Sequence, residues 1–187
     1  MQVGYRPSVD APPHDAASLL GSSLEVTMPK LNDTVRDLLI RQVGREMFAS
    51  LTYRMAKSAW YEAGCTAAHR WAREEAEHEV HHSRKVDKYL AQRGEVVACP
   101  TVEGPKVVRG ATDIAKTLLA LEESVTDDWQ AIHEAAEAAH DGETCSLSIR
   151  FLDEQVDGVD AARRVLRFAS ATTDSMAFDQ QMENEFG

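Results

Sequence analysis

Apolar side chains recur along most of this chain at the spacing of an α-helix rather than that of a strand. Between residues 31 and 63, Val35, Leu38 and Leu39 are apolar, which places them on one helical face. The same three- and four-residue recurrence is found in three later stretches, at 66–93, 111–141 and 144–170. No stretch alternates apolar and polar residues as a half-buried strand does. The pattern therefore predicts an all-α protein with four long amphipathic helices.

Prolines and glycines indicate where these helices should begin and end. The prolines are at positions 7, 12, 13, 29, 100 and 105, so the stretches 30–99 and 106–187 contain none. Because a proline inside a helix costs about 3 kcal/mol, such stretches permit long helices. Glycines at 64, 94 and 142 divide them further. We predict helices over about 32–62, 66–93, 111–140 and 144–170, a short fifth helix over 174–185, and an N-terminal extension over 1–30.

The links between the predicted helices indicate how they pack. Short links at Gly64 and Gly142 should fold the helices into two antiparallel hairpins. Residues 94–110 have no helical periodicity, and at about 3.3 Å per extended residue they can span the length of a bundle. We therefore expect one domain over 31–187, an antiparallel four-helix bundle with one long crossover between its second and third helices.

Polar residues interrupt the apolar face of each predicted helix. They are Glu46 and Tyr53 in the first helix, Glu75 and His78 in the second, Glu122 in the third and Gln155 in the fourth. A buried carboxylate without a partner costs several kcal/mol, so carboxylates at one level of a bundle need a compensating charge. A dinuclear metal site would supply that charge, and oxygen and nitrogen ligands favour Fe(II) or Mn(II).

The sequences around these residues resemble those of the ferritins. The matching motifs are REMFASLTY at 45–53, REEAEH at 73–78, LEESVTD at 121–127 and FLDEQVD at 151–157. The chain is most similar to haem-free ferritins with an H-type ferroxidase centre, over about residues 31–186. The resemblance implies a ferritin-like fold and a homo-oligomeric cage of 24 subunits. It also implies that the cage stores ferric mineral and that the fifth helix lines its fourfold channels.

The resemblance also implies a role for each residue. Two Fe(II) ions per subunit would be oxidised by O₂ or H₂O₂ at this centre. Glu46 and His78 would bind one iron, Glu122 the other, and Glu75 would bridge them, while Gln155 would hydrogen-bond metal-bound water or oxygen and Tyr53 would hydrogen-bond beside the site.

Four positions differ from relatives within the family. Ala76 stands where bacterioferritins have a haem-ligating methionine, so we expect no haem. Gly158 stands where some bacterial ferritins have a further glutamate of a third iron site. Cys145 and Ser148 stand where animal-type ferritins have the acidic residues of the threefold channel. The route by which iron enters, and a third iron site, are therefore left open.

Other functions fit parts of the sequence. His78, Glu79 and His82 match H-E-x-x-H, the zinc-protease motif of two histidines one turn apart with a glutamate between them. A zinc protease also needs a third ligand and usually a strand beside the motif, and no strand is predicted. We expect His81 and His82 to face solvent or the inner surface. The sequence also allows a ferritin-like diiron oxidase that stores no iron, and a helical interaction module with structural carboxylates.

Charge and composition narrow the possible partners. The 187 residues include 31 acidic and 20 basic side chains, a net charge of −11, which disfavours nucleic acid and anionic membranes as partners. No apolar stretch is long enough to span a membrane, and no secretory signal is visible. The three cysteines are widely spaced and fit a reducing compartment, so we expect a cytoplasmic protein, with an organelle as the alternative. An acidic surface attracts cations, as an iron-storing shell would require.

Overall fold

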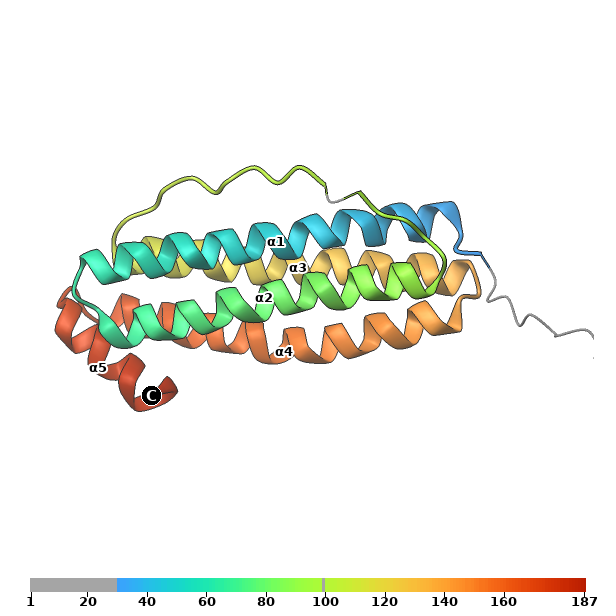
Figure 1. Ribbon diagram of the computed structural model, residues 1–187. Helices are drawn as coiled ribbons and strands as arrows, with labels where there is room; N and C mark the ends of the chain where they lie inside the picture. The colour runs from blue at the N-terminus through green and yellow to red at the C-terminus, as the bar shows by residue number, and fades with distance from the viewer. Residues whose placement is uncertain (1–29, 99) are drawn as a thin grey trace, which may run out of the picture.

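The computed structural model describes residues 30–98 and 100–187, and the helices predicted from the sequence are present there. Four long helices form an antiparallel bundle, and a short fifth helix folds back at one end (Figure 1). No strand occurs in the described residues. The all-α bundle with a fifth helix is thus confirmed, whereas the predicted extension over 1–30 lies almost wholly outside the described residues. The helices are α1 (Asp33–Glu62), α2 (Thr66–Gln92), α3 (Ala111–Ala138), α4 (Gly142–Ala171) and α5 (Ser175–Phe186).

Side-chain caps determine where several helices begin. The Oδ1 atom of Asn32 accepts a hydrogen bond from the backbone N–H of Thr34 at the start of α1. Asp141 caps α4 through the N–H of Thr144, so this helix begins at Gly142, two residues before the predicted start. Helix α3 ends at Ala138, two residues before the predicted end.

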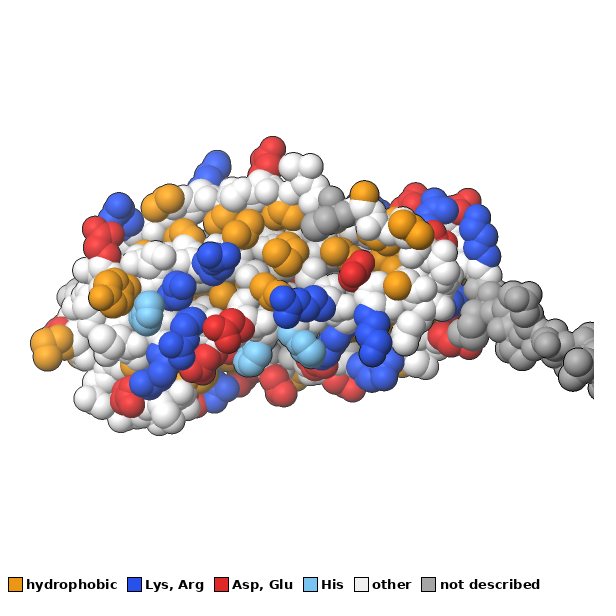
Figure 2. Space-filling model, viewed as in Figure 1, with side chains coloured by type: hydrophobic (Ala, Val, Ile, Leu, Met, Phe, Trp, Pro, Cys, Tyr) orange, Lys and Arg blue, Asp and Glu red, His pale blue; other side chains and the backbone are white. Residues whose placement is uncertain are grey.

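The crossover between α2 and α3 runs along α1 from one end of the bundle to the other (Figure 1). It passes so close to α1 that a Cβ atom at Gly44 would lie 2.9 Å from Cγ of Pro100. Apolar side chains gather over α1 beneath the crossover, whereas charged side chains predominate over α2 (Figure 2). Gly44 therefore lets the crossover lie against the bundle.

Helix α5 is fastened to the start of α2. The carboxylate of Asp179 accepts hydrogen bonds from the backbone N–H groups of Thr66, Ala67 and Ala68, which have no partner inside their own helix. Phe178 and Met182 of α5 are buried against the bundle. Within the described residues, no helix combines the length and apolarity needed to cross a membrane.

The core is mainly apolar, with a polar layer at the middle of the bundle and a buried ion pair, Arg93 with Asp141, at the end where α2 stops and α4 begins. Large side chains such as Leu39, Ile114 and Leu118 are fully buried, and each contributes about 1.5–3 kcal/mol by leaving water. Between these apolar layers the helices bury several carboxylates, an amide and a phenol. The fold thus positions a cluster of polar groups where an ordinary bundle would be apolar.

Candidate metal centre

Three helices contribute to a buried cluster at the middle of the bundle. Glu46 comes from α1, Glu79 and His82 come from α2, and Glu122 comes from α3. The three carboxylates are buried, and the side chain of His82 is only 14% exposed. Glu46, Glu79 and His82 each place one potential ligand atom within 4.8 Å of the others. Carboxylate and imidazole groups at this spacing can hold a metal ion.

The carboxylate of Glu46 is hydrogen-bonded at one oxygen and bare at the other. Its Oε1 accepts hydrogen bonds from Nε2 of Gln42 at 2.8 Å and from Nε1 of Trp129 at 3.0 Å. Its Oε2 is buried and has no hydrogen-bond partner among the described residues. A buried oxygen without a donor is costly, and a cation at this position would remove the cost. Oε2 faces Nδ1 of His82, 4.0 Å away.

His82 is held from both sides of its ring. Nδ1 lies 3.2 Å from Oε2 of Glu79, and Nε2 lies 2.9 Å from Oε2 of Glu154. Nζ of Lys85 donates to the same Glu154 carboxylate at 3.0 Å. Burial works to raise the pKa of Glu154, but the hydrogen bond and charge of Lys85 together with His82 keep it below its usual value. Glu154 is therefore a charged partner for His82.

The second side of the cluster is built around Glu122. The hydroxyl of Tyr53 donates to Oε1 of Glu122 at 2.6 Å. Oε2 of Glu122 lies over Gly158 of α4, where an added Cβ atom would be only 3.1 Å away. Gln155 is also buried, and its Oε1 accepts a hydrogen bond from the hydroxyl of Thr126. One oxygen of Glu122 is thus fixed by Tyr53, and the other is directed to a space that a glycine leaves open.

The carboxylates hold protons more tightly than they would in water. Burial, followed by repulsion from Glu79, raises the pKa of Glu46 to about 8. Burial, followed by repulsion from Glu122, raises the pKa of Glu79 to about 8. Burial also raises the pKa of Glu122 to about 7, although the hydrogen bond from Tyr53 works to lower it. A metal ion would supply the positive charge that this cluster lacks.

The structure brings four of the six residues predicted as a site together. Glu46, Tyr53, Glu122 and Gln155 all lie in the buried layer. The other two, Glu75 and His78, lie one helical turn away, and their side chains are 28% and 65% exposed. They pair with each other at 3.4 Å, and Glu79 and His82 stand beside Glu46 instead.

The sequence contains the E-x-x-H spacing twice, at Glu75–His78 and at Glu79–His82, and the packing of α1 on α2 distinguishes them. The hydroxyl of Ser50 donates to the carbonyl of Ala76, and that of Ser83 donates to the carbonyl of Val43. Residues at equal distances from the turn at Gly64 therefore face each other, so Glu46 is level with about residue 80. That register was the signal that could have selected Glu79 and His82.

Of the two histidines expected to face solvent or the inner surface, one is exposed and the other is not. His81 is exposed, as expected, but the side chain of His82 is only 14% exposed and lies in the cluster rather than facing solvent. The H-E-x-x-H motif does not form a histidine pair, because His78 is exposed while His82 points inward. Glu79, which would be the catalytic base of a zinc protease, is itself a member of the buried cluster.

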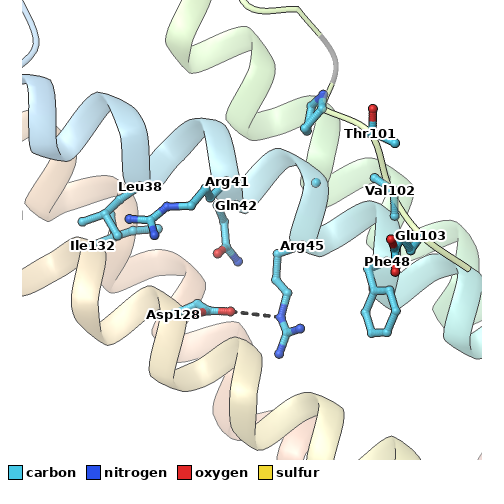
Figure 3. A pocket seen from close by; sticks show the side chains of 12 residues that line it. Leu38, Arg41, Gln42, Arg45, Phe48, Thr101, Val102, Glu103, Asp128 and Ile132 are labelled. Carbon is cyan, nitrogen blue, oxygen red and sulfur yellow. Dashed lines mark ion pairs between the residues drawn. The ribbon is translucent and has the colours of Figure 1, made fainter. Parts of the chain in front are cut away.

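Two pockets flank the cluster. One, of about 600 Å³, opens between α2 and α4 and is lined by Glu75, His78, Glu79 and Glu122 among others. The other, of about 440 Å³, lies between α1, α3 and residues 100–103 of the crossover (Figure 3). Arg45 and Asp128 form an ion pair in it, and Gln42 lies in its wall. Gln42 thus connects this outer pocket to the carboxylate of Glu46.

A four-helix bundle that buries carboxylates and an imidazole at its middle defines a helical-bundle metal-binding protein. The family model of the ferritin-like domain matches residues 36–169, and the chain belongs to the ferritin family. A bacterial non-heme ferritin of Staphylococcus epidermidis is 32% identical over 121 residues, which cover 64% of this chain and 72% of the relative. A bacterial non-heme ferritin of Staphylococcus haemolyticus is 27% identical over 128 residues, covering 68% and 77%.

A solved structure has the same fold. It is an open pore ferritin from the hyperthermophilic archaeon Archaeoglobus fulgidus, and it superposes with a TM-score of 0.79 at 20% sequence identity. The superposition covers 83% of this chain and 97% of the archaeal chain.

Proposed function

We propose that this protein oxidises Fe(II) and stores the ferric product as a mineral inside a hollow cage. The observation that carries the proposal is the buried cluster of Glu46, Glu79, His82 and Glu122, in which one oxygen of Glu46 has no hydrogen-bond donor among the described residues. Buried carboxylates are stable only when they are protonated, paired or bound to metal. In a ferritin bundle, iron is the cation that such a cluster would take.

Glu79 and His82 replace Glu75 and His78 as the α2 ligands in this proposal. Oε2 of Glu46 and Nδ1 of His82 would bind the first iron, because they face each other across the gap. Glu79 would bridge the two irons, since it interacts with Glu46 on one side and Glu122 on the other. Glu122 would bind the second iron. Glu75 is close enough to repel Glu122, so it would line the approach to that second position.

Iron would reach the centre through the pocket between α2 and α4. Acidic and imidazole groups line this pocket outside the buried cluster, and they attract cations by their charge and by transient ligation. They are Glu74, Glu75, His78, His81 and Asp157, and Glu154 beside them adds its charge. The exposed Glu75 and His78 would therefore contribute to delivery of iron to the oxidation site.

The oxidation needs no further cofactor. Each of two Fe(II) ions would give up one electron, and the two electrons reduce O₂ to the peroxide level or H₂O₂ to water. Carboxylate oxygens stabilise the ferric product because they are hard, negatively charged ligands. Gln155 lies beside this space and would orient water or oxygen there by hydrogen bonding. Haem plays no part in the proposed reaction.

A pair of matched substitutions on α2 tests the site. His82→Ala should slow the initial rate of aerobic Fe(II) oxidation by at least about tenfold, since a metal ligand is lost. His78→Ala, one turn away on the same helix, should change that rate by less than about threefold. Glu79→Ala and Glu75→Ala should differ in the same direction. The opposite ranking would return the ligand role to Glu75 and His78 and refute the proposed set.

The assembly is tested separately, by size-exclusion chromatography with light scattering. A cage of 24 subunits, as the family resemblance implies, would have about 24 times the chain mass of 20.7 kDa. A net charge of −11 per chain would then surround the cavity with an acidic field. A monomer or dimer that still oxidises Fe(II) would refute storage and favour an oxidase that acts on another substrate.

A further inference from the structure

Three of the four proposed iron ligands have one potential ligand atom held by a neighbouring side chain outside the ligand set. Gln42 and Trp129 donate to Oε1 of Glu46, which leaves Oε2 facing the gap. Tyr53 donates to Oε1 of Glu122, which leaves Oε2 of the same carboxylate to bind a metal. His82 follows the same arrangement, because its Nε2 faces the carboxylate of Glu154 at 2.9 Å, while its Nδ1 faces the other ligands, Glu79 at 3.2 Å and Glu46 at 4.0 Å.

We propose that Glu154, held in place by Lys85, is a positioning residue that fixes the orientation and tautomer of His82, so that Nδ1 presents its lone pair to the metal. The inference rests on the proposed function of the centre and adds two residues to it that need not touch iron. Neither residue is part of the ligand set, and Glu154 is 45% exposed at the mouth of the pocket.

The hydrogen-bonding chemistry of the imidazole supports this role. A neutral imidazole has one N–H donor and one acceptor nitrogen, and the environment selects which nitrogen carries the hydrogen. An ionised carboxylate can only accept, and Glu154 lies closer to Nε2, at 2.9 Å, than Glu79 lies to Nδ1, at 3.2 Å, so Glu154 favours the hydrogen on Nε2 of His82. In the opposite tautomer, Nδ1–H would point at the carboxylates of Glu46 and Glu79 and would cover the lone pair that a metal needs.

Lys85 and an aromatic pair hold this arrangement rigid. Nζ of Lys85 lies 3.0 Å and 3.3 Å from the two oxygens of Glu154, so the carboxylate cannot turn away without losing both contacts. The same ammonium group lies 5.5 Å from the centre of the Phe151 ring. Phe151 meets the His82 ring edge-on at 5.4 Å and stacks on Trp129 at 3.9 Å. The imidazole is therefore fixed by packing on one side and by charge on the other.

The first test measures the tautomer without any metal. Solid-state ¹⁵N NMR of histidine-labelled, metal-free protein reports which ring nitrogen carries hydrogen, whatever the particle size, and His82→Ala identifies the signal. The wild-type protein should show Nε2–H at His82, and Glu154→Ala should shift the population towards Nδ1–H. Asp153→Ala, an exposed carboxylate on the same helix, should leave the signal unchanged. An unchanged tautomer in Glu154→Ala would overturn the proposal.

The second test measures metal affinity with Co(II), a divalent ion that can be titrated into the protein without being oxidised as Fe(II) would be. Glu154→Ala should weaken Co(II) binding by about 10–100-fold, the usual effect of losing a group that orients a metal-bound histidine. Lys85→Ala should weaken it by a smaller factor, because the carboxylate remains, and Asp153→Ala should not weaken it. Equal Co(II) affinity in the wild type and in Glu154→Ala would also overturn the positioning role.

The two readouts separate this inference from the proposed function. If Co(II) bound equally well to the wild type and to Glu46→Ala, the metal centre would be refuted. The NMR measurement would still test the contact between Glu154 and His82. If Co(II) bound tightly and Glu154→Ala changed neither tautomer nor affinity, the centre would stand and the positioning role would fall. Thermal melting of each variant shows that a lost signal does not reflect unfolding.

Discussion

Metal binding to this centre should release protons, because the buried carboxylates hold them in the metal-free protein. Burial and mutual repulsion raise the pKa of Glu46 and of Glu79 to about 8, so both are mainly protonated at pH 7. The pKa of Glu122 is raised to about 7, so it is partly protonated at that pH. A divalent metal needs all three as carboxylates. About two protons per chain should therefore leave when Co(II) fills the centre at pH 7.

Isothermal titration calorimetry counts these protons. The observed enthalpy of Co(II) binding is measured at one pH in buffers of different ionisation enthalpy, and its slope against that enthalpy is the number of protons released. The contribution of the three carboxyl groups to this count should rise towards three at pH 5.5, where all three are protonated, and fall towards zero at pH 9. The apparent affinity should rise with pH over the same range.

Glu79→Gln supplies the decisive comparison. The amide of glutamine does not titrate. Because it is uncharged, it also removes the repulsion by which Glu79 raises the pKa of Glu46. The count at pH 7 should fall to about one, whereas Glu77→Gln, at an exposed position on the same helix, should leave it at about two. A wild-type count near zero at pH 7 would show that the cluster is ionised before metal arrives, and would refute the claim that burial keeps it protonated.

One change of pH and two glycine substitutions test other parts of the structure. A raised carboxyl pKa means that the unfolded chain ionises from about pH 4.5 while the folded protein keeps its protons. The free energy of unfolding of the metal-free protein should therefore fall as the pH rises from about 5 to 8 and should level off above pH 8. The fall is at most about 1.4 kcal/mol per pH unit for each group. Urea titrations that showed a rise over this range would contradict the prediction. Gly158→Ala should weaken the second of two Co(II) sites by pressing on Oε2 of Glu122 at 3.1 Å, while Gly142→Ala, with no atom within 4 Å, should leave both sites unchanged in the same titration. Gly44→Leu should lower the melting temperature by several degrees, because its side chain would collide with Pro100 at 2.9 Å; an unchanged melting temperature would show that the crossover is free to move.

Local rules were sufficient to predict the helices and their order. Proline-free stretches, glycines at the turns and apolar residues at helical spacing are properties of short segments, and the observed helices begin and end within two residues of the predicted positions. The differences arise where a cap decides the boundary. Asp141 accepts from the N–H of Thr144, which starts α4 earlier than periodicity alone suggests.

The site was partly predictable, and the reason for the limit is geometric. On α1, α3 and α4 the predicted Glu46, Glu122 and Gln155 interrupt the apolar face and lie in the buried layer, so these three could be found from pattern alone. Helix α2 offers two E-x-x-H pairs one turn apart, and residue types do not distinguish them. Only the level of each pair relative to Glu46 does, and that level is fixed by how α1 packs on α2.

The groups that hold the ligands are harder still to find in a sequence, because each has an ordinary structural explanation. Trp129 falls on the apolar face of α3 and would be counted as core, yet its indole N–H donates to Glu46. Glu154 and Lys85 are part-exposed charged residues of the kind that usually form weak surface pairs. Their significance comes from the third group that they share, His82, which no sequence spacing connects to α4. In this bundle a residue's type indicates what it can donate or accept, and only packing against three other helices determines whether that capacity serves the metal centre.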